Sequence, residues 1–159
     1  GSVPTWGTLI NGIDVWLFPS NASKDLWLNF HIDHDYKPDS LIFPHIHWCP
    51  TTTGTGVVRW GIEYTVAKGH GQQAFPTTTT IYLEQAASGT ARMHQIIESA
   101  VGVDFGVEVD SMIMLRVFRD AAHANDTYTG DAAGLFCDLH YQSDRLNTPQ
   151  KSPNFYAGG

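Results

Sequence analysis

The feature that most constrains the fold is an alternation of apolar and polar residues in several separate stretches. In DLWLNFHID (25–33), every second residue from Leu26 to Ile32 is apolar, and Trp27 lies on the other side. Side chains that alternate with a period of two are those of a β-strand with one buried face. The same period recurs in VVRWGIEYTVA, TTTIYLEQ, SMIMLRVFRD and GLFCDLHYQ. The chain is therefore predicted to be all-β.

The joints between these stretches define the architecture. They are rich in Gly, Pro, Asn and Asp, as in KPDS, TTTGTG, KGHGQ and LNTPQKSPN. Short strands separated by such turns indicate an antiparallel β-sandwich, here predicted to be of jelly-roll type. We expect a single domain over 1–159, with 1–8 and 146–159 as extended arms. In ARMHQIIESAVG (91–102), a strand or irregular crossover is favoured over a short helix.

Composition and charge exclude several classes of function. The net charge is −7 with only nine Lys and Arg residues, which argues against nucleic acid as a partner. No apolar run reaches the roughly 20 residues that span a bilayer, so no membrane insertion is expected. Charged residues make up 16% of the chain, and a surface of Thr, Gly and His is typical of extracellular or virion β-proteins. Cys49 and Cys137 are predicted to be buried free thiols.

The stretch FPHIHWCP (43–50) places His45 and His47 on one face of a predicted strand and Trp48 on the other. Such a pair could chelate a metal, line a catalytic cleft or belong to a packed polar interface. If this strand lies beside those predicted for VVRWGIEYTVA, SMIMLRVFRD and GLFCDLHYQ, their polar side chains join the same face. The predicted structural polar network is His45, His47, Glu63, Arg116, Asp138 and His140.

A bound metal ion is the alternative to this network. A His-x-His pair with a third histidine suits a divalent transition metal, and the ligands here would be His45, His47 and His140. Cupin-type enzymes use such a set with a Glu soon after the second histidine, but no acidic residue follows His47 until Glu63. Hydrogen-bonded structural histidines are therefore favoured, with no cofactor and no catalytic residues. A cupin-like metal-dependent enzyme using His45 and His47 remains the alternative.

Candidate binding residues are aromatic or lie in a polar loop. Trp48 and Trp60 are expected in the core, whereas Trp16 and Trp27 are candidates for stacking on sugar rings. The loop DAAHANDTYTGDA (120–132) carries oxygen ligands that could hold calcium, but its Asx-turn chemistry is favoured. The candidate binding residues are Trp16, Trp27, Asn125, Asp126 and Tyr128.

Four motifs occur in a fixed order over residues 26–155. They are H-x-H-W in FPHIHWCP, W-x-x-E-Y in VVRWGIEYTVA, D-T-Y-x-G-D-A in DTYTGDAAG, and D-x-H-Y in CDLHYQ. In this order they resemble a family of tailed-bacteriophage virion proteins. The motif residues are His45, His47, Trp48, Trp60, Glu63, Tyr64, Asp126, Tyr128, Asp131, Asp138, His140 and Tyr141.

The resemblance implies a small non-catalytic β-sandwich found alone or at the end of a tail fibre or tailspike. Its expected role is trimerisation and attachment to a glycan of the host surface, and a capsid decoration protein is the alternative. The expected partners are further copies of the chain, preferably in a trimer, other virion proteins and a host surface polysaccharide. The protein would be assembled in the bacterial cytoplasm and function in the virion, outside the cell.

Overall fold

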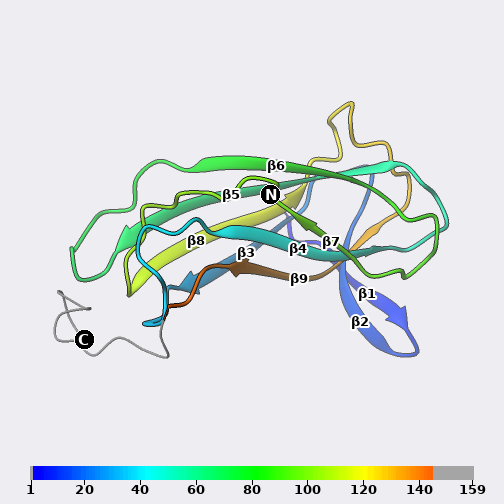
Figure 1. Cartoon of the computed structure of the whole chain (residues 1–159). Helices are drawn as coiled ribbons and strands as arrows, with labels where there is room; N and C mark the ends of the chain where they lie inside the picture. The colour runs from blue at the N-terminus through cyan, green and yellow to red at the C-terminus, as the bar shows by residue number, and fades with distance from the viewer. Residues whose placement is uncertain (1, 145–159) are drawn as a thin grey trace.

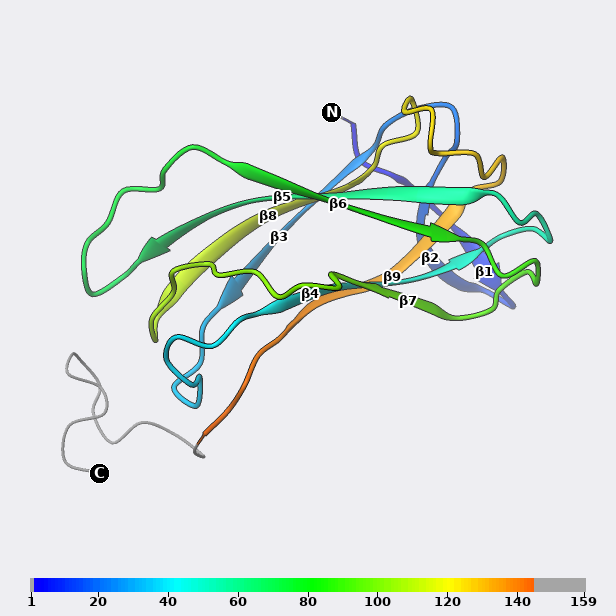
Figure 2. The same cartoon turned by 45° about the horizontal axis from the view of Figure 1, so that its top comes forward.

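Two antiparallel β-sheets pack face to face in this protein. A computed structural model describes residues 2–144, and these residues form nine strands and no helix. In Figure 2 the layer containing β3, β5, β6 and β8 lies over the layer containing β4, β7 and β9. No helix within residues 2–144 could therefore cross a membrane. The predicted all-β sandwich is confirmed.

The strand order is that of a jelly roll. One sheet has the order β1 (Thr5–Ile10), β2 (Ile13–Phe18), β9 (Ala132–His140), β4 (Phe43–Pro50) and β7 (Gln95–Glu98). The other has the order β3 (Asp25–His31), β8 (Ser111–Arg119), β5 (Val57–Lys68) and β6 (Thr79–Ala86). From β2 to β9 the chain changes sheet at every step except the β5–β6 hairpin. The last strand returns between β2 and β4 (Figure 1).

The core lies between the sheets and consists of the residues that the alternation assigns to the inner faces. Trp48 of β4 and Trp60 of β5 are both inaccessible to solvent, with ring centroids 6.2 Å apart in an edge-to-face arrangement. Phe18 of β2 packs edge-on against Trp60 at 5.0 Å. Such edge-to-face aromatic pairs are favourable geometries that add to the burial of apolar area. Cys49 and Cys137 are buried and free, as predicted.

The less regular segments also take defined structures. The range 91–102 contains the strand β7, so the preference for a strand over a helix is confirmed. Within the predicted arm 1–8, Thr5 onward belongs to β1, which pairs with β2. Asn11 and Gly12 join these strands with positive φ angles, as a two-residue hairpin turn requires. The predicted arm 146–159 lies outside the described residues.

The topology divides the predicted polar network into two groups. His45, His47, Asp138 and His140 lie on β4 and β9 and face outward from the five-stranded sheet. Glu63 and Arg116 are register partners on β5 and β8, in the other sheet. The prediction of one continuous polar face is therefore wrong, because alternation gives the face of each strand but not the sheet that the strand joins.

Candidate functional sites on the outer faces

The outer face of the four-stranded sheet carries a row of polar groups beside an exposed tryptophan. The register aligns Trp27 with Arg116, and Arg116 with Glu63. Arg116 Nε donates to Glu63 Oε2 at 2.6 Å, and its Nη1 donates to Asp25 Oδ1 at 2.8 Å. Thr78 Oγ1 donates to the other oxygen of Glu63 at 2.6 Å. The two carboxylates and the guanidinium are thereby fixed next to the Trp27 ring.

This row borders a hollow of about 290 Å³. Trp27 is 56% exposed, so one side of the hollow is an accessible aromatic surface. Hydrogen bonds from Thr78 and Arg116 hold the pKa of Glu63 below its usual range, which keeps this carboxylate ionised and an acceptor. The hollow is lined by Trp27, Leu28, Glu63, Thr65, Thr78, Met114, Leu115 and Arg116.

A second polar row follows on the same face. Arg59 forms an ion pair with Asp120, at 3.0 Å, and with Glu84, and its guanidinium lies over the Tyr82 ring at 4.0 Å. Asn125 Nδ2 donates to Glu84 Oε1 at 2.9 Å, and this bond and the one from Arg59 lower the pKa of Glu84. Tyr82 is a second exposed aromatic ring on this face.

The predicted loop residues separate into one surface residue and two buried ones. Asn125 is exposed and borders the Arg59 row. The Asp126 carboxylate is 1% exposed and paired with Arg119, and Tyr128 is 1% exposed with its hydroxyl bonded to the Thr52 N–H. A buried carboxylate already held by a guanidinium is a structural group, so the binding role predicted for Asp126 and Tyr128 is corrected.

Trp16 and Trp27 meet at a groove of about 420 Å³ between the edges of the two sheets. The side chains along it are apolar, and Phe136 at its margin is 63% exposed. Trp16 also packs edge-on against Trp6 at 4.7 Å, at the base of the β1–β2 hairpin. The groove residues are Trp16, Phe18, Leu26, Trp27, Leu28, Ile46, Trp60, Val117, Gly134, Leu135, Phe136 and Cys137.

A histidine cluster occupies the outer face of the five-stranded sheet. His45 is buried, and its ring lies 3.6 Å from that of His140, measured between centroids. His47 Nδ1 lies 2.9 Å from His94 Nε2 and so pairs with a histidine that sequence reasoning did not select. Among residues 2–144, the group able to surround a metal ion is His45, Glu98 and His140, without His47. Glu98 was missed because nothing in the sequence shows that the four-residue strand β7 pairs with β4.

A second histidine cluster surrounds Asp110, just before β8. Asp110 Oδ1 lies 2.9 Å from His31 Nε2 and 3.2 Å from His34 Nε2, and Oδ2 lies 2.7 Å from His70 Nε2. Histidines from two segments, 31–34 and His70, both distant in sequence from Asp110, thus converge on its carboxylate. Asp110 also has a positive φ of 63°, a backbone conformation that Asp tolerates better than most residues.

The chain was compared with protein-family models, curated proteins and solved structures. No protein-family model, curated protein or solved structure matches the chain. The function is therefore inferred from the side chains at the two outer faces and the groove, together with the order of motifs in the sequence.

Proposed function

We propose that this chain is a non-catalytic module of a tailed-bacteriophage virion that attaches to a host surface polysaccharide. The attachment surface is the outer face of the four-stranded sheet. One observation carries the proposal: the exposed Trp27 ring borders an open hollow in which the Arg116–Glu63 pair is already fixed. The assignment to a virion is supported by the order of motifs in the sequence, which resembles that of phage virion proteins.

The chemistry of this face suits a sugar chain. The apolar face of a sugar ring complements an aromatic plane, while its hydroxyl groups need both donors and acceptors. Trp27 supplies the plane, Arg116 supplies donors, and the ionised Glu63 supplies acceptors. Charge-assisted hydrogen bonds of this kind are stronger than those between neutral groups.

The extent of the face favours a polymer over a single sugar. Trp27 lies on β3 and the exposed Tyr82 on β6, which are the two edge strands of the sheet. Three strand spacings of about 4.8 Å cover roughly 14 Å across the sheet, and the register offsets Tyr82 from Trp27 by two residues, about 7 Å, so the two positions lie roughly 16 Å apart. Arg59, Glu84 and Asn125 continue the polar surface beside Tyr82. A chain of several sugars lying across the strands would contact both rings.

The charge of the protein selects the class of polysaccharide. Arg59 and Arg116 are each paired with two carboxylates, and the whole chain carries a net charge of −7. A polyanion would be repelled by this charge distribution. The proposed ligand is therefore a neutral, hydroxyl-rich polysaccharide.

A second part of the proposal concerns assembly. We propose that the apolar groove lined by Trp16, Leu135 and Phe136 packs against a second copy of the chain in a homo-trimer. Its side chains offer few hydrogen-bonding groups for a sugar, whereas apolar surface with exposed aromatic rings is the usual material of subunit contacts. A capsid decoration protein with the same self-contact is the alternative location in the virion.

The histidine placement bears on the cupin-like alternative. An enzyme of that type needs an enclosed metal pocket, but His45 and His47 project from the outside of the sandwich. The space between the sheets is filled instead by Ile46, Trp48 and Trp60. This arrangement favours the non-catalytic proposal.

Binding to intact host cells and to an array of neutral polysaccharides tests the attachment surface. Trp27→Ala should weaken binding at least about tenfold, equivalent to about 1.4 kcal/mol, and Arg116→Gln should act in the same direction. Phe75→Ala is the matched control, because Phe75 is an exposed aromatic residue outside the hollow. Equal binding by all three variants would contradict the proposed surface.

Light scattering coupled to size exclusion tests the assembly. The wild-type chain should elute with the mass of a trimer, and Phe136→Ser should reduce that mass while leaving the monomer folded. A wild-type chain that remains monomeric at high concentration would refute the self-contact without affecting the glycan test.

A further inference from the structure

We propose that His45, Glu98 and His140 bind a divalent transition metal ion of the Zn²⁺ class on the outer face of the five-stranded sheet. The three residues come from adjacent strands, with β4 lying between β9 and β7. One potential ligand atom from each lies within 4.8 Å of the other two. The register places His45 directly opposite Glu98, and His140 is opposite Phe43 on the other side.

The hydrogen bonds of His45 point to a cation at its Nε2 atom. His45 Nδ1 lies 2.8 Å from the carbonyl oxygen of Phe43, which only accepts, so Nδ1 carries the proton. In a neutral ring Nε2 is then a bare lone pair, and it faces Glu98 Oε2 at 2.7 Å. Two acceptors at this distance repel each other unless a positive charge lies between them.

A backbone carbonyl on the other ring nitrogen is also the usual arrangement around a metal-bound histidine. Such a contact fixes the tautomer and the ring orientation and increases the basicity of the ligating nitrogen. His45 is 4% exposed, so its ring is held in place by the surrounding sheet. The central ligand is thus preorganised before an ion arrives.

The side chains around the proposed site add negative charge. Within residues 2–144, no Lys or Arg is paired with Glu98 or Asp138 that would compete with a metal ion. Asp138 Oδ2 lies 3.3 Å from His140 Nε2, so a carboxylate stands beside the second imidazole as well. Asp138 Oδ1 is buried without a hydrogen-bond partner among the described residues and lies 3.5 Å from His47 Nε2. Two carboxylates, those of Glu98 and Asp138, therefore lie against these histidines, and their negative charge favours a bound cation.

The ligand set and its exposure indicate the type of ion. Two imidazoles and one carboxylate suit Zn²⁺, and Co²⁺ or Ni²⁺ as substitutes, better than Mg²⁺ or Ca²⁺, which prefer oxygen ligands. Ligand atoms about 2.0–2.1 Å from a tetrahedral Zn²⁺ lie roughly 3.3 Å apart. Glu98 and His140 have side chains 47% and 61% exposed, so both have room to adjust around the fixed His45. The remaining coordination position would face solvent.

The competing explanation is a simple ion pair, with His45 doubly protonated against Glu98. Metal binding distinguishes the two directly. Tag-free protein is treated with EDTA, dialysed and titrated with Zn²⁺ by calorimetry, and Co²⁺ is added separately to follow its d–d absorption in the visible. We expect one equivalent of Zn²⁺ bound with a Kd in the micromolar range or below, and intense tetrahedral Co²⁺ bands.

Variants at the two exposed ligands keep the test independent of folding. Glu98→Gln and His140→Ala should each weaken Zn²⁺ binding at least about tenfold, by analogy with losses around metal ligands. Zn²⁺ at about 100 times the wild-type Kd should raise the Tm of the wild-type chain by roughly 5–10 °C, and that of a variant with tenfold weaker binding by no more than about half as much. His70→Ala is the matched control, since it alters the histidine cluster at Asp110 and should bind Zn²⁺ like the wild type.

Absence of Zn²⁺ binding to the wild-type chain would overturn the proposal and leave the ion pair. So would binding that Glu98→Gln and His140→Ala retain, or that His70→Ala loses. The site lies on the opposite outer face from Trp27, so none of these outcomes depends on glycan attachment.

Discussion

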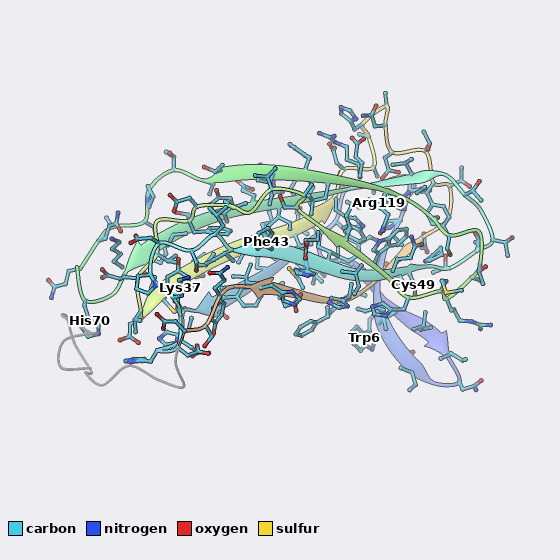
Figure 3. All side chains as sticks on the ribbon, viewed as in Figure 1. Trp6, Lys37, Phe43, Cys49, His70 and Arg119 are labelled. Carbon is cyan, nitrogen blue, oxygen red and sulfur yellow. The ribbon has the colours of Figure 1, made fainter. Side chains whose placement is uncertain are left out.

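Arg119 and Asp126 form a doubly hydrogen-bonded ion pair that is removed from solvent, with side chains 0% and 1% exposed. Arg119 Nε donates to Oδ2 at 2.9 Å, and Nη2 donates to Oδ1 at 2.7 Å. Nη1 donates further to the carbonyl oxygens of Phe18 and Gly130. The guanidinium therefore joins the end of β8 to the loop before β9 and to β2, at the end of the sandwich where Figure 3 labels it.

Removing one member of this pair is expected to be severe. Asp126→Ala leaves a buried guanidinium without its counter-ion, which costs about 3–5 kcal/mol of the free energy of unfolding. Asp126 Oδ2 also accepts the backbone N–H of Arg59 at 3.0 Å, so that donor loses its partner too. Urea unfolding followed by fluorescence measures the change.

Asp131→Asn, in the same loop, is the control for Asp126→Ala and should change stability by less than about 0.5 kcal/mol. Equal stability of the two variants would show that the ion pair contributes little.

Gly61 is required by a close contact across the outer face. A Cβ atom at this position would lie 2.2 Å from the nearest ring atom of Phe118, its register partner on β8. The Arg116 guanidinium covers the same ring at 4.4 Å. Gly61→Ala should therefore displace Phe118 and destabilise the chain by about 1–3 kcal/mol.

Thermal unfolding of Gly61→Ala beside Gly71→Ala checks this prediction, because a Cβ at Gly71 would make only ordinary contacts. If the two variants melt together, the Phe118 ring moves aside at no cost.

The sequence predicts the face of each strand well because a period of two is a local property. Trp48 and Trp60 are in the core, and Trp27 is exposed, as the alternation indicates. The same alternation continues along β8 to Arg119, an inward position. A charged residue in an apolar row is therefore a sign of a buried ion pair, but the sequence does not show that its partner is Asp126 rather than the adjacent Asp120.

The pairing of strands could not be predicted in the same way. Neighbours such as β2 and β9, or β4 and β7, meet through contacts between residues far apart in the chain. For this reason the sequence could not show that Glu63 and His45 lie in different sheets, or that Glu98 lies opposite His45. Three histidines around Asp110 were missed for the same physical reason.

Because of Asp110, we expect the free energy of unfolding to depend on pH in the acidic range. Burial raises the pKa of its carboxyl group, but hydrogen bonds from His70 and His31 and the nearby His34 outweigh that effect, so the pKa lies below its usual value. A pKa that is lower in the folded than in the unfolded chain stabilises the fold above the unfolded value of about 3.9. That contribution is lost as the pH falls through the folded pKa.

Asp110→Asn should accordingly lower the free energy of unfolding above about pH 5, and its difference from wild type should shrink below about pH 4. Asn tolerates the positive φ of this position. Asp39→Asn is the control, since Asp39 also has a positive φ, of 59°, and should show no such pH-dependent difference. Urea unfolding at pH 3 to 7 measures both, and a difference that stays constant down to pH 3 would exclude the histidine–carboxylate contribution.

Cys137 is expected to be unreactive in the folded chain although it lines the groove. Burial, with a smaller effect from the neighbouring Asp138, raises the pKa of its thiol to about 12. At pH 8 only about one thiol in 10⁴ is then ionised, and the thiolate is the reactive form. In a Cys49→Ala variant, an aromatic disulfide reagent at pH 8 should therefore modify Cys137 only as fast as the chain unfolds. The rate of labelling should rise with urea in parallel with the unfolding rate. In guanidinium chloride, the extent of labelling should reach one equivalent per chain. Rapid labelling without denaturant would show that the groove opens while the sandwich remains folded, and that its apolar walls are accessible in the free chain.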